Sequence, residues 1–214
     1  MKKAFVVLFV LAISVASVAQ TTLDQRGQGR GLFSGREKYV WVEAKLGRAF
    51  LQAGNGTIES SNVFYGGAGI GVGVVMKNTM LGIGGAFECV DLMDKSYSFP
   101  LFVELRHCVP LKSSHGLLVG AKGGWILGGD RSFPTEKPIG GQVLMGTTVR
   151  SMKGPYVEAM FGYRFHQFVF FVSYNYRIVN YQTSYYDSQA NATFSEPWKK
   201  NLHVVMGGLG FRIF

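Results

Sequence analysis

The stretch GGAGIGVGVVMK, residues 66–77, alternates glycine with apolar side chains, and it decides the fold class. Glycine stands at positions 67, 69, 71 and 73, and apolar residues stand at positions 68, 70, 72 and 74. A period of two places the two sets on opposite faces of a β-strand. The stretch is not a nucleotide-binding loop, because it lacks the G-x-G-x-x-G spacing and no helical pattern follows it.

The same period of two continues along the chain, in segments separated by turn residues. Expected strands occupy residues 38–52, 62–77, 80–91, 98–109, 116–127 and 141–151, a long segment from residue 155, and residues 201–214. The connections after the first, third, fifth and seventh strands are long, and the others are short. Even strand number and alternating connections are typical of an up-and-down transmembrane β-barrel with both termini on the short-turn side. We therefore predict an all-β, eight-stranded antiparallel barrel.

One segment leaves the strand count open. Its apolar positions change from odd-numbered to even-numbered at His166 and Gln167. A β-bulge there restores the phase within a single strand, and we predict that bulge. A turn at the same place would give nine strands, or ten if residues 181–188 also pair.

The two faces of each strand differ in chemistry. Leu101 and Val103 share one face of the fourth strand, whereas Glu104 and Arg106 share the other. A β-sandwich or lipocalin-like barrel would show a polar face to water, but here the second face has many glycines and few small polar groups. In a membrane barrel the apolar face contacts lipid and the charged face lines the lumen.

The predicted lumen carries charges of both signs. An eight-stranded barrel has an interior that side chains fill, so it forms a core rather than a pore. Opposite charges buried there must pair, because an unpaired buried ion costs several kcal/mol. The expected internal network holds Glu43, Lys45, Glu88, Glu104, Arg106, Lys122, Glu158, Arg164 and Arg212. We expect it to be a polar plug that holds the strand register; a gated ion path or a proton relay is the functional alternative.

Several phrases together resemble the small bacterial outer-membrane β-barrels, the family that includes the OmpA-type transmembrane domain. They are the leader MKKAFVVLFVLAISVASVA, GGAGIGVGV, FPLFVELRH, EAMFGYRF and the closing GGLGFRIF. The resemblance implies a bacterial outer-membrane location and a role for Phe214 as the terminus read by the barrel-assembly machinery. In the family, the terminal Phe usually follows aromatics on its own face, whereas here Phe214 shares its face with Gly210 and Arg212.

The ends of the chain fit an exported protein. Residues 1–19 combine two lysines, an apolar run and a small-residue cleavage site, so we predict a signal peptide. Residues 20–37 are polar and rich in Gly and Arg, which predicts a flexible periplasmic lead-in to a barrel over residues 38–214. The formal net charge of +9 suits contact with anionic lipid or polysaccharide. No RNA-binding signature or clustered basic run occurs, so nucleic acid is not an expected partner.

Catalytic and metal-binding patterns are missing from the sequence. The four histidines are scattered, none lies in an H-x-S or H-E-x-x-H arrangement, and no C-x-x-C occurs. We therefore predict no enzymatic activity, metal or cofactor. Cys89 and Cys108 fall on opposite faces and near opposite ends of their hairpin, which predicts two free thiols.

The segment of residues 180–198 is expected to be a long outer loop. It is rich in tyrosine and small polar residues, which suits either recognition of a sugar or protein partner or an aromatic girdle with a solvated loop. The expected function is a structural or surface-interaction barrel, in contact with the lipid bilayer and lipopolysaccharide. A small ion or solute pore is the first alternative, and a lipid-modifying enzyme is the second.

Overall fold

The structure is a computed structural model that describes residues 37–52, 58–90, 96–112, 114–139, 142–187 and 192–213. The expected signal peptide and all but the last residue of the expected lead-in lie outside the described residues, as does Phe214. Among the described residues, no helix is long and apolar enough to cross a membrane. The described strands are β1 (Glu37–Gln52), β2 (Ile58–Met76), β3 (Thr79–Val90), β4 (Ser96–Lys112), β5 (His115–Leu127), β6 (Arg131–Ile139), β7 (Gln142–Ser151), β8 (Gly154–Phe165), β9 (Phe168–Asp187) and β10 (Ala192–Arg212).

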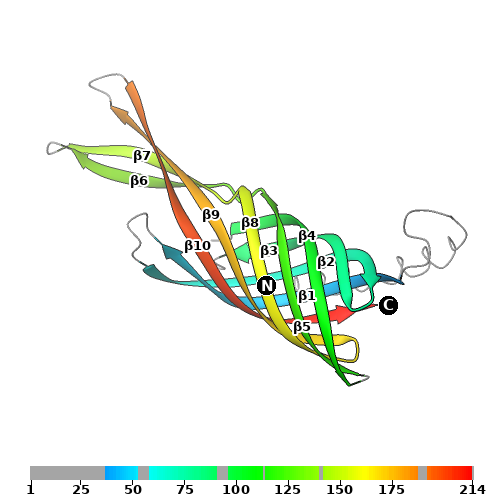
Figure 1. Ribbon diagram of the computed structural model, residues 1–214. Coiled ribbons are helices and arrows are strands. Elements are labelled where there is room, and N and C mark those ends of the chain that lie inside the picture. Colours follow the sequence, from blue (N-terminus) through cyan, green and yellow to red (C-terminus); the bar gives the residue numbers. More distant parts are fainter. Residues whose placement is uncertain are drawn as a thin grey trace, which may run out of the picture.

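Eight of the strands close into an antiparallel barrel, which confirms the predicted fold class (Figure 1). Their order around the barrel is β1, β2, β3, β4, β5, β8, β9 and β10, and β10 pairs with β1. One line of paired residues runs from Tyr39 through Gly73, Gly82, Glu104, Lys122, Glu158, Asn175 and Val204 to Ala49. The line returns to β1 ten residues beyond its start, so the shear number is 10. The strands therefore tilt, by about 35–45° in barrels of this kind.

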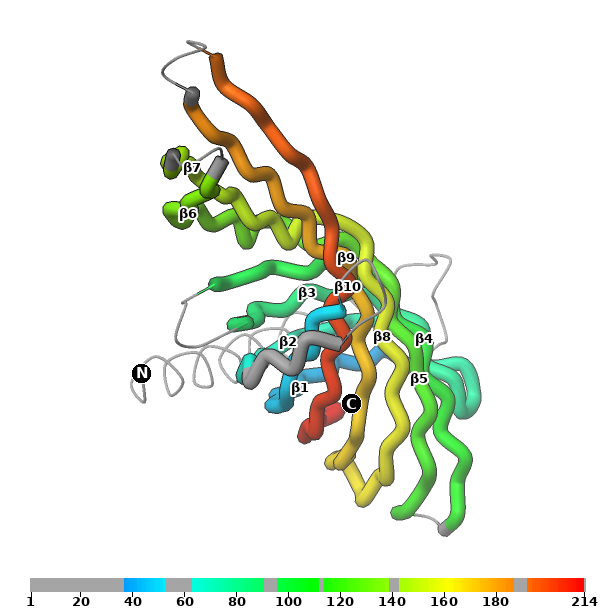
Figure 2. Tube along the Cα trace, turned by 90° about the vertical axis from the view of Figure 1, so that its left-hand side faces the viewer, coloured from blue at the N-terminus to red at the C-terminus, as the bar shows by residue number. Residues whose placement is uncertain are grey.

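The other two strands, β6 and β7, form a hairpin beyond the barrel wall. β7 pairs with the end of β9, which itself pairs with the start of β10. These four strand segments, β6, β7, residues 180–187 of β9 and residues 192–200 of β10, are called the wing from here on. Figures 1 and 2 show the wing projecting from one end of the barrel. The segment expected to be an outer loop, residues 180–198, is thus mostly paired strand.

The wing corrects two predictions about connections. Residues 128–140 were expected to form a loop, but Arg131–Ile139 is strand β6. Residues 152–155 were expected to form a short turn between neighbouring barrel strands. Instead, β7 and β8 run in the same direction along β9, pairing at Ser151 with Asn180 and at Tyr156 with Arg177. Lys, Gly and Pro are common in turns, but here residues 153–155 lie at the junction of β7 and β8, where the chain does not reverse direction.

The phase change at His166 and Gln167 is a turn, so the predicted bulge is wrong. Phe165 pairs with Phe168 across these two residues, and His166 has a left-handed φ of 56°. A left-handed residue is usually Gly, Asn or Asp, although His is also found there more often than most residues. The split divides the expected seventh strand into β8 and β9, so the barrel keeps eight strands although the expected sixth strand, β7, lies outside it. Together with β6, the described residues form ten strands.

The outer wall of the barrel is apolar and exposed. Many large side chains there are more than two-fifths exposed, and they come from all around the wall: Leu46, Ile83, Leu101, Val103, Leu105, Val119, Trp125, Val157, Phe161, Phe170 and Val172. A soluble protein rarely exposes so much contiguous apolar surface. The hydrocarbon of a membrane is the environment that such a wall fits.

The lumen contains two apolar layers at its two ends. The lower layer, at the short-turn end, consists of Tyr39, Trp41, Val75, Met80, Cys108, Leu118, Met160, Val169 and Phe171. The upper layer, at the wing end, consists of Ala49, Tyr65, Val90, Phe102, Ile126, Met152, Tyr156, Val179, Tyr181, Leu202, Val204 and Met206. Inward glycines make room for the large rings, because a Cβ on Gly210 would overlap the Trp41 indole and one on Gly208 would overlap the Phe171 ring.

Candidate functional site

A belt of charged side chains lies in the lumen between the two apolar layers. Its members occupy inward positions of strands, where alternation directs every second side chain into the barrel. They are Glu43, Lys45, Glu88, Glu104, Arg106, Lys122, Glu158 and Arg177, each at most 3% exposed. Four carboxylates thus face four cations, so these eight residues, called the charge belt below, are electrically balanced.

Glu43 from β1 is the hub of one half of the belt. Its carboxylate contacts Lys122, lies 3.1 Å from Arg106 Nη2 and lies 3.5 Å from Lys45 Nζ. The indole Nε1 of Trp41 donates a further hydrogen bond of 2.8 Å to it. A carboxylate with three cations and a neutral donor is well compensated for the loss of water.

Glu158 from β8 joins the two lysines across the lumen. Lys45 Nζ donates to its Oε2 at 2.8 Å, and Lys122 Nζ lies 3.8 Å from its Oε1. Asn175 from β9 donates to Oε2 at 3.4 Å. Residues from β1, β5 and β9 therefore converge on this carboxylate of β8, which ties opposite walls of the barrel together.

Glu104 and Arg106, two residues apart on β4, form a short pair of 2.5 Å. Tyr39 donates its hydroxyl to the other oxygen of Glu104 at 2.9 Å. The Arg106 guanidinium lies 3.8 Å from the centroid of the Trp41 ring, which is cation–π geometry. This pair connects the charge belt to the lower apolar layer.

Glu88 and Arg177 form the end of the belt nearest the wing, 3.0 Å apart. Ser98 donates to Glu88 at 3.3 Å, and Arg177 donates to the Tyr65 hydroxyl at 3.2 Å and to Asn175 Oδ1 at 3.0 Å. Sequence reasoning missed Arg177, although the even-numbered apolar positions after His166 and Gln167 already left this odd-numbered residue on the other face. Its parity with Ser173 and Asn175, opposite the run of outward aromatics on that strand, is the signal that would have identified it.

Two of the nine residues expected in the lumen network lie outside the belt. Arg164 is near the short-turn end of β8, where its partner in the ladder is Val169. Arg212 lies at the rim and pairs with Glu37 at 3.4 Å. The other seven expected residues come together in the belt. Phe214, the expected barrel-assembly terminus, lies outside the described residues.

The histidines of β4, β5 and β10 face outward and contact hydroxyl groups. His115 Nδ1 lies 2.5 Å from the Tyr163 hydroxyl, His203 Nδ1 lies 2.5 Å from the Tyr174 hydroxyl, and His107 Nδ1 lies 2.9 Å from Thr79 Oγ1. Within the ranges that the structure describes, no group of three or more His, Cys, Asp or Glu could hold a metal ion.

The two cysteines, Cys89 and Cys108, are buried and are not joined in a disulfide, which confirms the prediction of two thiols.

The wing carries a second set of interactions, on the face continuous with the lumen. Trp198 stacks on Tyr181 with centroids 3.9 Å apart and donates to Thr183 at 3.2 Å. Lys137 of β6 reaches Glu196 of β10 at 2.5 Å. The Lys137–Glu196 pair spans the wing from β6 to β10, over the two strands between them.

A closed barrel with charges inside and an apolar wall outside belongs to the class of membrane-spanning β-barrels. In this class the lumen side chains, and not the outer ones, take the place of the polar surface of a soluble protein. The charge belt and the exposed wall described above define the class for this chain.

Comparisons with known proteins return small outer-membrane barrels. No family model and no curated protein matches the chain. It is similar to the crystal structure of Neisserial surface protein A at 10% identity and a TM-score of 0.44, covering 83% of this chain and 98% of that one. It is also similar to the N-terminal β-barrel domain of Pseudomonas aeruginosa OprF, at 12% identity and a TM-score of 0.40, covering 83% of this chain and 99% of that one. Similarity to the outer membrane protein AlkL in DMPC bilayers is at 9% identity and a TM-score of 0.41, covering 87% of this chain and 95% of that one. These are likenesses in the path of the chain, and the assignment to the class rests on the barrel itself.

Proposed function

We propose that the protein is a bacterial outer-membrane β-barrel that does not conduct ions and serves a structural or surface-interaction role. The observation that carries this proposal is the charge belt, sealed between the lower and upper apolar layers. An ion crossing the lumen would have to displace paired charges that are almost wholly buried. Breaking one buried pair costs about 3–5 kcal/mol, so the resting lumen is closed.

The wing supports the surface-interaction part of the proposal. β9 and β10 run on past the barrel at the wing end, whereas the two-residue turns that join β2 to β3 and β8 to β9, and the start of β1, lie at the other end. In membrane barrels the longer loops face the outside of the cell. The wing would therefore stand above the outer leaflet, where Phe194, Trp198 and Tyr186 are exposed to a partner.

The expected partners follow from this placement. The wall faces the lipid bilayer, and its wing end faces lipopolysaccharide in the outer leaflet. The barrel-assembly machinery would recognise the C-terminal residue Phe214, which follows the last strand, β10.

Planar-bilayer recording tests the proposal directly. The matched variant is Glu104→Ala combined with Arg106→Ala, which removes one paired set of charges and its volume together. We expect no stable current steps from the wild-type protein and steps from the double variant. Stable steps from the wild-type protein would overturn the proposal in favour of a small pore.

Two further measurements address membrane location and catalysis. A folded membrane barrel migrates differently on gels before and after heating, so the unheated band should shift on boiling. Lipid A incubated with purified protein should keep its acyl composition. A soluble protein without a heat-dependent shift excludes the barrel in the membrane, and an altered acyl pattern identifies a lipid-modifying enzyme.

A further inference from the structure

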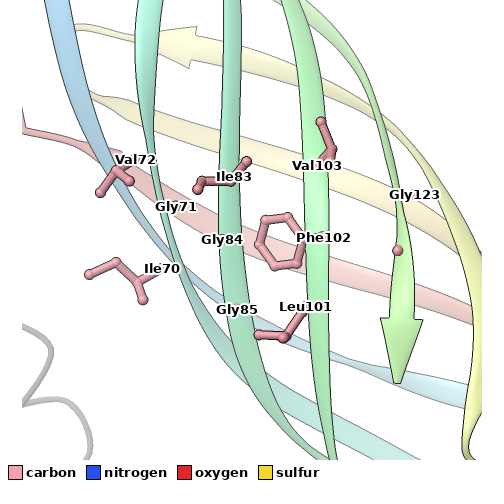
Figure 3. Close-up of a pocket in the computed structure, with 11 residues that line it drawn as sticks. Ile70, Gly71, Val72, Ile83, Gly84, Gly85, Leu101, Phe102, Val103 and Gly123 are labelled. Carbon is pink, nitrogen blue, oxygen red and sulfur yellow. The ribbon is translucent and has the colours of Figure 1, made fainter. Parts of the chain in front are cut away.

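An apolar groove of about 530 Å³ crosses the outer wall of the barrel over β2, β3, β4 and β5 (Figure 3). Its floor is one line of paired residues at inward positions, Gly71, Gly84, Phe102 and Gly124. Because the Phe102 side chain points into the lumen and the three glycines have no side chain, the outer surface along the line is bare backbone. The groove therefore belongs to the outer wall and is separate from the charge belt.

Two rows of outward side chains form the banks of the groove. One row is Ile70, Gly85, Leu101 and Trp125, and the other is Val72, Ile83, Val103 and Gly123. Each bank lacks one side chain, at Gly85 on β3 and at Gly123 on β5. These two gaps widen the ordinary furrow between rows into a groove.

The glycine at position 123 has no explanation in the packing of the fold. A Cβ on Gly84 would meet the Phe102 ring and one on Gly71 would meet the Glu104 carboxylate, so those glycines serve the lumen. A Cβ on Gly123 would meet nothing within 4 Å. Glycine inside a strand costs stability, because it restricts a freer unfolded chain and packs no side chain. The free space outside Gly123 is therefore a property of the outer surface.

The chemistry of the groove selects its occupant. The outward side chains on both banks are apolar or absent, and no charged side chain lines it. A second copy of the chain is a poor fit, because two such grooves brought together by a two-fold axis would face each other and leave a void between them. A flexible hydrocarbon chain can fill the groove without leaving a polar group unpaired.

The groove also has a direction. The line from Tyr39 to Ala49 climbs from the short-turn end of β1 to its wing end while passing β2, β3, β4 and β5 in turn. The groove runs parallel to it, so its β5 end is the higher one. The exposed Trp125 stands there, and Phe87 and Phe99 lie in the next row up, with rings 5.3 Å apart. Aromatic side chains of this kind mark the interface of the bilayer.

We propose that the groove binds one hydrocarbon chain of an outer-leaflet lipid, which enters beside Trp125 and lies across Gly123 towards Ile70. The proposal rests on the membrane location and orientation proposed above. The groove would then hold one acyl chain more tightly than the rest of the wall, which contacts lipid without a preferred position.

Photo-crosslinking tests the site, with purified protein in phosphatidylcholine nanodiscs that contain a phospholipid carrying a diazirine in its acyl chain. The variant is Gly123→Leu, which fills the groove. The control is Gly207→Leu, because Gly207 is also outward, has no atom within 4 Å of a Cβ, and lies on β10 away from the groove. Both variants are first checked for the heat-dependent gel shift.

We expect wild-type protein to be labelled several-fold more at Leu101 and Val103 than at Phe161 and Val172 on other parts of the wall. Gly123→Leu should abolish that excess, and Gly207→Leu should leave it intact. Uniform labelling of the wall in the wild-type protein, or an excess that survives Gly123→Leu, overturns the lipid site while leaving the membrane barrel in place. Labelling that is absent from the whole wall overturns the membrane location instead.

Discussion

The pair of Glu104 and Arg106 offers the sharpest test of how the charge belt stabilises the barrel. Arg106→Met keeps an extended apolar stem but removes the cation that lies 2.5 Å from Glu104. Glu104 then keeps only the Tyr39 hydroxyl among the contacts described above, and the belt acquires a net charge of one negative unit. The second variant adds Glu104→Gln, which restores neutrality and leaves an acceptor for Tyr39.

The expected magnitudes follow from these contacts. Leaving one buried charge of a pair without its partner costs about 3–5 kcal/mol. Loss of the cation–π contact with Trp41 adds about 0.5–2 kcal/mol, and this part is lost in both variants. Glu43 loses Arg106 but retains Lys45 and Lys122 in both. The single variant should therefore lose at least about 3 kcal/mol, and the double variant should recover about 2 kcal/mol or more of it.

Guanidinium unfolding in phospholipid bilayers, followed by tryptophan fluorescence, measures both free energies of unfolding. The heat-dependent gel shift first establishes that each variant folds. A double variant as unstable as the single one, or less stable, would refute the reasoning. In that case the side-chain volume of Arg106, and not the balance of charge, would be its contribution.

Three other expectations concern backbone space, a turn and the base of the wing. Gly210→Ala should cost about 1–3 kcal/mol of unfolding free energy, because its Cβ overlaps an indole ring in the lumen, whereas Gly207→Ala on the same strand should be nearly neutral. His166→Gly should raise the unfolding free energy by about 0.5–1 kcal/mol, because it relieves a left-handed φ of 56°. Hydrogen bonds from the side chains of Lys153 and Ser151 lower the pKa of Asp130. The ionised carboxylate therefore stabilises the base of the wing above the unfolded pKa of about 3.9, and this contribution is lost as the pH falls through the lower folded value. Protease cleavage within β6 and β7 should increase below about pH 4, and Asp130→Asn should remove the pH dependence.

Each of these expectations has a result that contradicts it. Equal losses for the two glycine variants would mean that strand propensity, and not the indole ring, sets the cost. A loss of stability in His166→Gly would mean that the imidazole contacts outweigh the backbone strain. A pH step that persists in Asp130→Asn would assign the titration to another group.

The lumen was more predictable than the connections. Alternation along single strands placed Glu43, Lys45 and Glu104 on the inward face, and that inference needs no knowledge of which strands are neighbours. Which cation each carboxylate contacts depends on the shear of the barrel, however, and shear is a property of the closed sheet. The eight-stranded barrel could thus be predicted from period and parity, whereas its internal pairing could not.

Two connections were predicted wrongly because the residue types in a short segment do not decide whether the chain turns there. Gly154 and its neighbours have the composition of a turn, yet they continue a strand along β9. His166 and Gln167 lack typical turn residues, yet they reverse the chain. The partner strand decides both outcomes, because ladder hydrogen bonds outweigh the weak preferences of two or three residues. Arg177 was missed for a different reason, because the even-numbered apolar positions of β9 already placed it on the lumen face and it was not counted among the lumen charges.

The balance of the charge belt has a consequence for how the chain folds. Glu43 and Lys45 lie on β1 and contact each other, but their other partners come from β3, β4, β5 and β8. β1 also pairs with β10, which lies at the other end of the described sequence. An open sheet would hold these charges away from their counterparts, in a lipid environment that penalises them heavily. Curled but unclosed sheets should therefore be scarce, and closure of the β1–β10 seam should be the step that makes folding cooperative.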